Sequence, residues 1–157
     1  MKDTVNEPEV LEWIGSKFRT VLSTDDCEGR HAIVEIVSEP NTGPPRHIHQ
    51  EEDEMFYILS GVLEFWVEGE TLIKSAGQTA FVARGLDHTY RVVSDQPARF
   101  LTIHNPGGFD NFISDIVKND YQIPGDMAAI AETAARYNCV FTGPPLESVD
   151  REDSLNG

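Results

Sequence analysis

The sequence predicts an all-β domain, an antiparallel sandwich or barrel followed by short helices. Between about residues 30 and 104 the chain runs as short segments that alternate apolar and polar residues and are rich in β-branched and aromatic side chains. Turn residues separate the segments, for example at Gly61, at 68–70 and at Arg84-Gly85. Several short strands at this spacing are typical of antiparallel sheets rather than of parallel βαβ units.

The expected strands follow one another in four stretches. Residues 31–39 alternate regularly and predict one strand. Residues 54–77 predict three strands, separated by a turn at Gly61 and another at Glu68-Gly69-Glu70. Residues 78–95 predict two more strands, and 98–105 a final one. Alternation with period two places every second side chain of these strands on one face, the face that would line a barrel interior.

The two flanks of this region differ from it. In the N-terminal flank, 1–29, residues 7–18 fit either a short amphipathic helix or an edge strand. In the C-terminal flank, apolar residues recur at helical spacing in two groups, the second beginning near Asp126 as its cap. These residues are Phe109, Phe112, Ile113, Ile116 and Val117, then Met127, Ile130, Ala134 and Tyr137. We therefore expect a barrel core over 30–104, a helical extension packed on it over 105–146, and a disordered tail over 147–157.

Length and charge narrow the classes of function. The chain has 157 residues, the size of one domain, and its 27 acidic and 12 basic residues give a formal net charge of −15. A field of that sign repels phosphate backbones and anionic lipids, so we expect neither a nucleic-acid nor a membrane partner. No apolar run approaches the ~18 residues that span a bilayer, and the acidic N-terminus does not resemble a signal peptide. We therefore expect a cytoplasmic protein, in which Cys27 and Cys139 are free thiols.

The stretch that carries chemistry is 43–61. His47 and His49 are two residues apart, so both rings point to the same face of an extended strand. Glu54 follows after a polar bend and can return its carboxylate to that face, and His88, just after the turn at Gly85, can supply a fourth ligand. A His-x-His pair alone is weak evidence, Glu54 alone fits a solvated acidic loop, and His88 alone fits a partly exposed residue. Their joint spacing indicates a metal site.

This set of side chains suits a divalent transition metal. Neutral imidazoles bind Zn, Ni, Mn, Fe, Co and Cu, and one carboxylate compensates part of the charge. Four protein ligands leave positions open on a metal that prefers six. A structural zinc site would more often be closed and rich in thiolates, and no cysteine is near this stretch. We expect one such metal ion, of unknown identity.

The same residues carry a resemblance to the cupin superfamily. Its first motif consists of HxH, a gap of four residues, Glu, a gap of six residues, and Gly. His47, His49, Glu54 and Gly61 match it. The second motif is matched by three of its positions, Gly77, Gly85 and His88. The sequence departs from the second motif at Ala83, where proline is usual, and at Val92, where asparagine is usual, and the leading glycine of the first motif is displaced to Gly43. These departures concern turns and packing rather than ligands.

The resemblance implies a double-stranded β-helix, or jelly-roll barrel, with the metal bound inside one end. The pattern after residue 105 is similar to that of small one-barrel cupins described as quercetin 2,3-dioxygenase-like, which implies a dioxygenase. Family habit, together with exposed barrel edges that a second subunit can cover, favours a homodimer.

Several other residues are candidates for the same pocket. Phe56, Ile58 and Phe65 on the inner face would form a wall suited to a flat or apolar ligand. Tyr90 shares the face of His88 and would be a proton donor near the metal, with Glu54 as the group that accepts a proton from a substrate hydroxyl.

Charged residues and further histidines fit either a pocket or a structural role. Arg84, in the turn before His88, is a candidate to meet an anionic substrate, whereas Arg46, Arg91 and Arg99 are more typical of surface charge. Two more histidines either line the cavity or form hydrogen bonds within strands: His31 and His104.

Three functions fit these residues. The first is a metal-dependent dioxygenase of a small enol, phenol or diketone-like molecule. The second is a metal-dependent isomerase, lyase or dehydratase, which would use the same ligands without dioxygen. The third is a module that binds a small molecule without catalysis, since one fold supports many functions.

Overall fold

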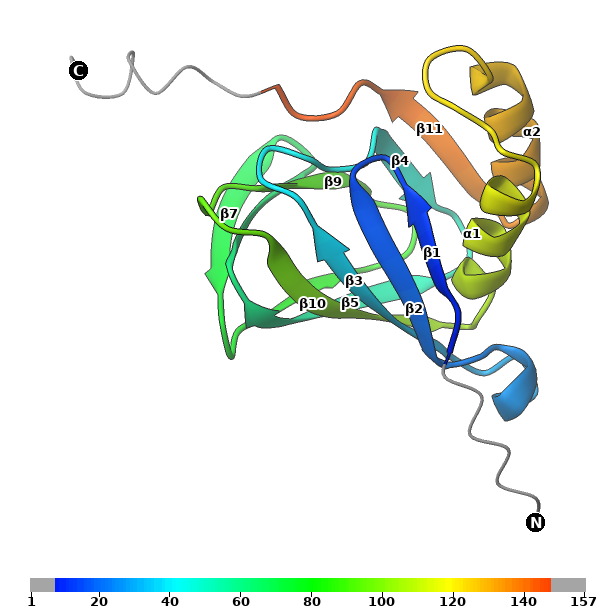
Figure 1. Cartoon of the computed structure of the whole chain (residues 1–157), viewed down its shortest axis with the longest axis horizontal. Coiled ribbons are helices and arrows are strands. Elements are labelled where there is room, and N and C mark those ends of the chain that lie inside the picture. Colours follow the sequence, from blue (N-terminus) through cyan, green and yellow to red (C-terminus); the bar gives the residue numbers. More distant parts are fainter. Residues whose placement is uncertain (1–7, 148–157) are drawn as a thin grey trace.

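Two antiparallel sheets face each other in the computed structural model, which describes residues 8–147 (Figure 1). The six-stranded sheet has the order β1 (Val10–Trp13), β2 (Ser16–Leu22), β3 (Ala32–Ser38), β10 (Ala98–Asn105), β5 (Asp53–Ser60), β8 (Thr79–Val82). The five-stranded sheet has the order β11 (Cys139–Gly143), β4 (Arg46–His49), β9 (Asp87–Val92), β6 (Val62–Val67), β7 (Glu70–Ser75). This is the predicted all-β jelly-roll barrel with short C-terminal helices.

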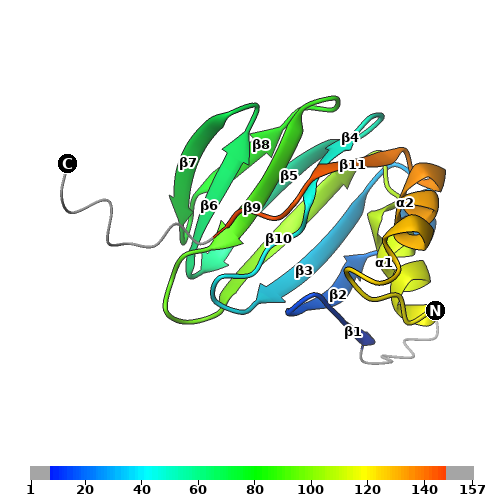
Figure 2. The same cartoon turned by 90° about the horizontal axis from the view of Figure 1, so that it is seen from above.

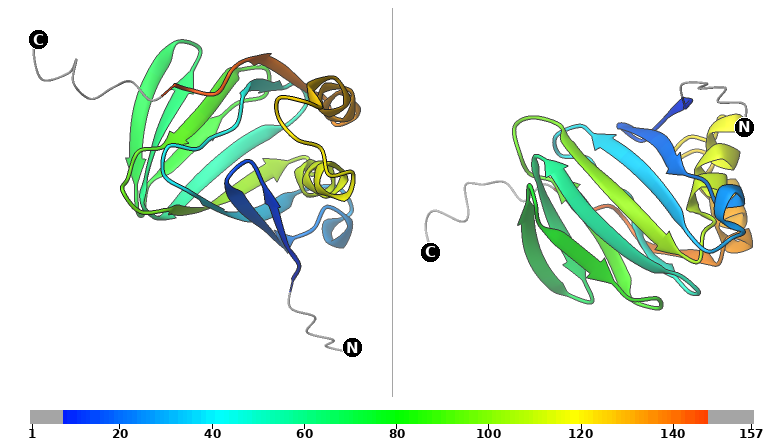
Figure 3. Two further views of the ribbon diagram at one scale, coloured as in Figure 1. Left: turned by 45° about the horizontal axis from the view of Figure 1, so that its top comes forward. Right: turned by 90° about the horizontal axis from the view of Figure 1, so that it is seen from below.

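The barrel interior is filled by the alternate residues that the period-two pattern selects. Strand β3 buries every second residue, and the neighbouring strands do the same on the faces that meet it. Figure 3 shows the two sheets curving around this shared interior. Its closed part is aromatic: Phe56, Phe65 and Phe100 are at most 1% exposed, and the Phe56 ring lies 4.8 Å from that of Phe65. Burial of these rings stabilises the barrel.

The N-terminal flank forms a hairpin, which settles the choice between helix and edge strand. Trp13 pairs with Ser16, so the connection between β1 and β2 is the two-residue turn Ile14-Gly15. Both residues have positive φ, 47° and 72°, as a type I′ turn requires. Gly15 lacks a side chain and accepts this conformation readily, whereas in a helix it would be destabilising. A short 3₁₀ turn, Asp25–Cys27, then leads toward β3.

The C-terminal flank contains both predicted helices, α1 (Phe109–Lys118) and α2 (Met127–Arg136). They lie side by side at one end of the barrel, away from β7 (Figures 1 and 2). Asp126 is at the N-cap position of α2, but its carboxylate accepts a hydrogen bond from the backbone N–H of Gln122 rather than from the first turn of the helix.

The sheets extend beyond the 30–104 segment on both sides. Strands β1 and β2 continue the six-stranded sheet, and β11, which the sequence did not predict within the helical extension, pairs with β4. Of the predicted tail, residues 148–157 lie outside the described residues. No helix in the described part of the chain is long and apolar enough to cross a membrane.

Candidate metal centre

Two neighbouring strands of one sheet and a third strand from the facing sheet bring the predicted ligands together at one end of the barrel. His47 on β4 lies directly opposite His88 on β9, and His49 follows two residues later on the same inward face. The turn before β9 is fixed to β4 by a hydrogen bond from the Gly85 N–H to the His49 carbonyl, 2.8 Å. Glu54 reaches the same space from β5 in the facing sheet. These four residues, called the metal cluster below because they could bind one metal ion, therefore join both sheets.

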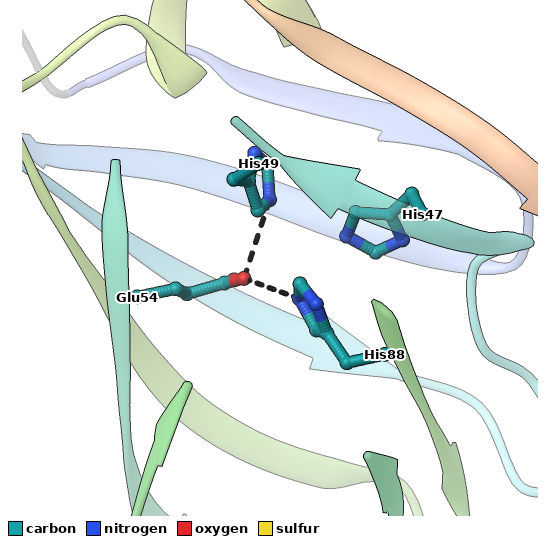
Figure 4. Close-up of side chains that lie close together, drawn as sticks. All are labelled: His47, His49, Glu54 and His88. Atoms are coloured by element: carbon teal, nitrogen blue, oxygen red, sulfur yellow. Dashed lines mark hydrogen bonds and ion pairs between the residues drawn. The ribbon is translucent and has the colours of Figure 1, made fainter. Parts of the chain in front are cut away.

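The four side chains form a compact buried group around the Glu54 carboxylate (Figure 4). Oε2 of Glu54 lies 2.9 Å from Nε2 of His88 and 3.3 Å from Nε2 of His49. The rings of His47 and His88 are 4.4 Å apart. One donor atom from each of the four residues lies within 4.8 Å of all the others, and none of the side chains is more than 9% exposed.

Backbone carbonyls orient two of the imidazoles for a metal. Nδ1 of His47 lies 2.8 Å from the Pro45 carbonyl oxygen, and Nδ1 of His88 lies 3.0 Å from that of Leu86. A carbonyl oxygen accepts only from a protonated Nδ1, so the Nε2 lone pair of each ring is left to face the cluster. Ligating histidines are commonly fixed in this way. The donor set thus fits a divalent transition metal.

Burial and neighbouring groups set the protonation of the cluster. Desolvation holds the pKa of His47 well below its usual value, so this imidazole is neutral. Burial raises the pKa of Glu54, but the neighbouring imidazoles, His104 foremost, outweigh it and hold that pKa well below the usual range. His47 and Glu54 are therefore in the forms that bind a metal. His49 differs, because burial lowers its pKa but Cys139, Glu52 and Glu54 outweigh burial and raise that pKa well above its usual value, so a metal would displace a proton from this ring.

Two further buried residues adjoin this cluster: Glu52 and His104, with 6% and 0% exposure. His104 is a candidate from the sequence, whereas Glu52 falls within the polar bend expected before Glu54 and is not predicted as a site residue. The period-two pattern contained the missed signal, because Glu52, Glu54, Phe56 and Ile58 alternate as one buried face. Donor atoms of His49, Glu52 and His104 also lie within 4.8 Å of one another.

An apolar cavity ends on the metal cluster. His47, His49 and Glu54 form its polar end. Its remaining lining is almost entirely apolar and comes largely from the flanks: Trp13, Ile14 and Phe18 from the N-terminal hairpin, Phe109, Phe112 and Ile113 from α1, Cys139 and Phe141 from β11, with Ile36, Pro44 and Tyr90 from the barrel. Among the described residues, this lining includes no lysine or arginine.

The structure corrects the predicted pocket wall. Phe56, Ile58 and Phe65 lie in the closed aromatic core rather than on the cavity surface, because they occupy the inward positions below the metal cluster. Arg84 lies outside the barrel, where its guanidinium pairs with Asp53 at 3.2 Å. Sequence periodicity assigns a residue to the inward face but does not tell how far along the barrel the open space extends.

Tyr90 does line the cavity, but its phenol is oriented toward the far end of the barrel. Burial raises the pKa of Tyr90, and its hydroxyl interacts with Ser38, the last residue of β3. The metal cluster lies near the first residue of that strand, since Ala32 pairs with His104. A role of Tyr90 as proton donor at the metal stays a prediction, and this placement does not favour it.

The other arginines have partners away from the cavity. The guanidinium of Arg46 lies over the ring of Trp66, 4.4 Å from its centroid. Arg91 and Arg99 pair with carboxylates, whose residues are Glu64 and Glu35. The expected surface charge fits Arg99, whereas Arg91 is buried, 8% exposed, and its ion pair is structural. None of the three arginines lines the cavity.

Comparison with known proteins identifies the barrel. Residues 34–104 match the family model described as "Cupin domain". Residues 34–104 therefore form a cupin domain. The matched residues include all four residues of the metal cluster and His104, whereas the N-terminal hairpin, both helices and β11 lie outside the match.

A curated relative of the cupin domain is quercetin 2,3-dioxygenase of Aspergillus japonicus, 26% identical over 132 residues, with 71% of this chain and 36% of that protein covered. Two solved structures share the fold. KdgF from Halomonas sp. has a TM-score of 0.60 at 18% identity and covers 68% of this chain and 95% of its own. The polyketide cyclase RemF from Streptomyces resistomycificus has a TM-score of 0.56 at 24% identity and covers 67% and 80%.

Proposed function

We propose that this cupin is a metal-dependent dioxygenase that acts on a small, uncharged, apolar enol or phenol. The observation that carries the proposal is the cavity: an apolar, largely aromatic lining that ends on His47, His49 and Glu54. A flat apolar molecule would bury its body against that lining and place one polar group at the cluster. The relative named quercetin 2,3-dioxygenase supports this choice among cupin activities.

The charges around the cavity favour an uncharged substrate. An anionic group in the body of the cavity, away from the metal, would need a cationic side chain as its partner, because an unpaired buried charge is strongly unfavourable. The cavity lining among the described residues offers none, and Arg84 is occupied by Asp53 on the outside. A protein with a net charge of −15 also repels anions as they approach.

The residues of the site have separate tasks. Bound by His47, His49, Glu54 and His88, a divalent metal would supply Lewis acidity and, if redox-active, electron transfer to dioxygen. The ionised Glu54 is close enough to the end of the cavity to accept the proton of a substrate hydroxyl. The aromatic lining excludes water from the reacting atoms.

The test combines metal analysis with oxygen uptake. Untagged protein, reconstituted with one metal at a time, is assayed with neutral flavonols and β-diketones and, in parallel, with an anionic substrate such as oxalate. We expect about one metal per chain and uptake with the neutral compounds only. Glu54→Gln should lose both metal and uptake, whereas Glu51→Gln, which removes an exposed carboxylate three residues away, should keep both.

Each other outcome selects a different function. No uptake with any metal would refute the dioxygenase. Turnover that persists without oxygen would identify a metal-dependent isomerase, lyase or dehydratase, and tight binding without turnover would identify a ligand-binding module.

A further inference from the structure

Each of the four residues in the metal cluster has one atom turned to the common centre and another turned to an outer partner. For His47 and His88 the outer partner of Nδ1 is a backbone carbonyl two residues earlier in the chain, Pro45 and Leu86. Both carbonyls lie in the backbone directly before a strand, β4 or β9, and need no further side chain to contact the ring. These two rings are therefore oriented by the backbone alone.

His49 and Glu54 differ, because their outer partners are side chains. Nδ1 of His49 lies 2.7 Å from Oε1 of Glu52, and Oε1 of Glu54 lies 3.5 Å from Nε2 of His104. The two outer side chains also approach each other, with 3.8 Å between Oε2 of Glu52 and Nδ1 of His104. Together with the 3.3 Å contact between His49 and Glu54, these distances close a ring of two carboxylates and two imidazoles.

The outer pair is as buried as the cluster itself. Glu52 is 6% exposed and His104 fully buried, with its ring stacked on Phe109 at 4.4 Å between centroids. Neither residue belongs to the cavity lining, so neither is placed to touch a substrate. A buried carboxylate is costly unless a nearby group compensates it, and Oε1 of Glu52 lies 2.7 Å from Nδ1 of His49.

The ring nitrogens of His49 and His104 have no aligned hydrogen bond to any described residue. Nε2 and Nδ1 of His49 both face carboxylates, at 3.3 and 2.7 Å, so the same ring is drawn toward Glu54 and Glu52 at once. A metal at Nε2 would remove this competition. It would leave Nδ1–H to Glu52, the arrangement by which a carboxylate commonly orients a ligating histidine.

We propose that Glu52 is the positioning residue of the metal centre: its carboxylate holds Nδ1 of His49 so that Nε2 faces the metal, while His104 holds the distal oxygen of Glu54. The inference rests on the metal centre of the proposed function, but not on the reaction that it catalyses.

The test is a titration of the metal-free protein with Co²⁺, followed by visible absorption and by competition with a chelator. Glu52→Leu removes the acceptor and should weaken Co²⁺ binding by about 10- to 100-fold, the usual effect of losing such a partner. Glu52→Gln keeps an oxygen that can accept and should lose less. Glu51→Gln, the neighbouring exposed carboxylate, should bind Co²⁺ as the unaltered protein does. The Co²⁺ spectrum should change in Glu52→Leu and stay unchanged in Glu51→Gln.

Several results would overturn the proposal. Folded Glu52→Leu with the unaltered dissociation constant and spectrum would refute the role of Glu52 and leave the metal centre standing. If Glu52→Leu does not fold, Glu52→Gln decides, and binding equal to that of Glu51→Gln refutes the role. Two Co²⁺ per chain, falling to one in Glu52→Leu, would make Glu52 a ligand instead. No Co²⁺ in the unaltered protein would refute the metal centre and this inference together.

Discussion

The barrel strands and the two flanks contribute different parts of the same cavity. The strands within 34–104 supply the polar end of the cavity through His47, His49 and Glu54. The flanks supply most of the apolar lining, through the N-terminal hairpin, α1 and β11. The candidate metal ligands therefore lie in the part of the chain that the family model matches, and most of the apolar cavity lining lies outside it.

This division explains why membership of the family does not by itself give the substrate. A barrel with the same four ligands and other flanks would present a different space to its ligand, as expected when functional sites are added to a common fold. Substitutions in the barrel and in the flanks should therefore have separable effects on stability, metal binding and substrate binding.

The largest effect should come from the barrel core. Phe100 is fully buried, with its ring 5.2 Å from Tyr90 and 6.2 Å from Phe56. Phe100→Ala should lower the free energy of unfolding by about 3–5 kcal/mol, through lost burial and the cavity left behind. Urea unfolding measures the loss. The matched control is Phe81→Ala, because the Phe81 side chain is 62% exposed. This substitution should change the free energy of unfolding by less than about 0.5 kcal/mol.

Loss of a ligand should rank next. His88→Ala removes an imidazole that is 1% exposed and in contact with Glu54. We expect metal affinity to fall by more than about 100-fold, the upper end of the effect of removing an outer partner of a ligand. The metal-free variant should still fold. Isothermal titration calorimetry measures the metal affinity, and circular dichroism measures whether the variant is folded. Unchanged metal affinity in a folded variant would show that the metal, if bound, is held elsewhere.

A substitution in a flank should change substrate binding and leave the metal content unchanged. Phe141 on β11 lines the cavity, 6.3 Å between its ring and that of His47. Phe141→Ala should raise the KM for an apolar substrate by about 10-fold, equal to 1.4 kcal/mol, with unchanged metal content. Val140→Ala, at the neighbouring exposed position, is the control. A loss of metal in Phe141→Ala alone would contradict the separation of roles between barrel and flank.

The sequence predicted the barrel better than the flanks for a physical reason. Strand alternation and the joint spacing of His47, His49, Glu54 and His88 are local signals, and the structure places all of these side chains where the pattern indicates. The cavity lining depends instead on which distant segments close the barrel. Strand β11 was missed because its partner β4 lies about 90 residues earlier, and no local pattern contains that pairing.

Buried polar residues were the other part of the site that the sequence did not fully predict. Glu52 lies in a run of four acids that is easily assigned to a solvated bend, and only its place in the alternation with Glu54 and Phe56 marks it as inward. The contact with His49 that gives the carboxylate its place is visible only in three dimensions.

The smallest effect should come from the outer contact that joins flank to barrel. Glu35 on β3 accepts from Arg19 of the N-terminal hairpin at 3.0 Å and from Arg99 on β10 at 2.7 Å. These guanidinium groups hold the pKa of Glu35 below its ordinary value of 4.5. A lowered carboxyl pKa stabilises the fold above the unfolded value, and the contribution is lost as the pH falls through the folded value.

Glu35→Gln should therefore lower the Tm by about 1–2 °C at pH 7, a small change because both guanidinium partners of Glu35 are exposed to solvent. The difference from the unaltered protein should shrink as the pH falls below 4.5 and vanish near the acid limit of folding. Differential scanning fluorimetry across this pH range measures it. A difference that grew toward acid would mean that Glu35 is stabilised as the protonated acid, and that the hairpin is held to the barrel by the β2–β3 pairing and apolar contacts rather than by this ion pair.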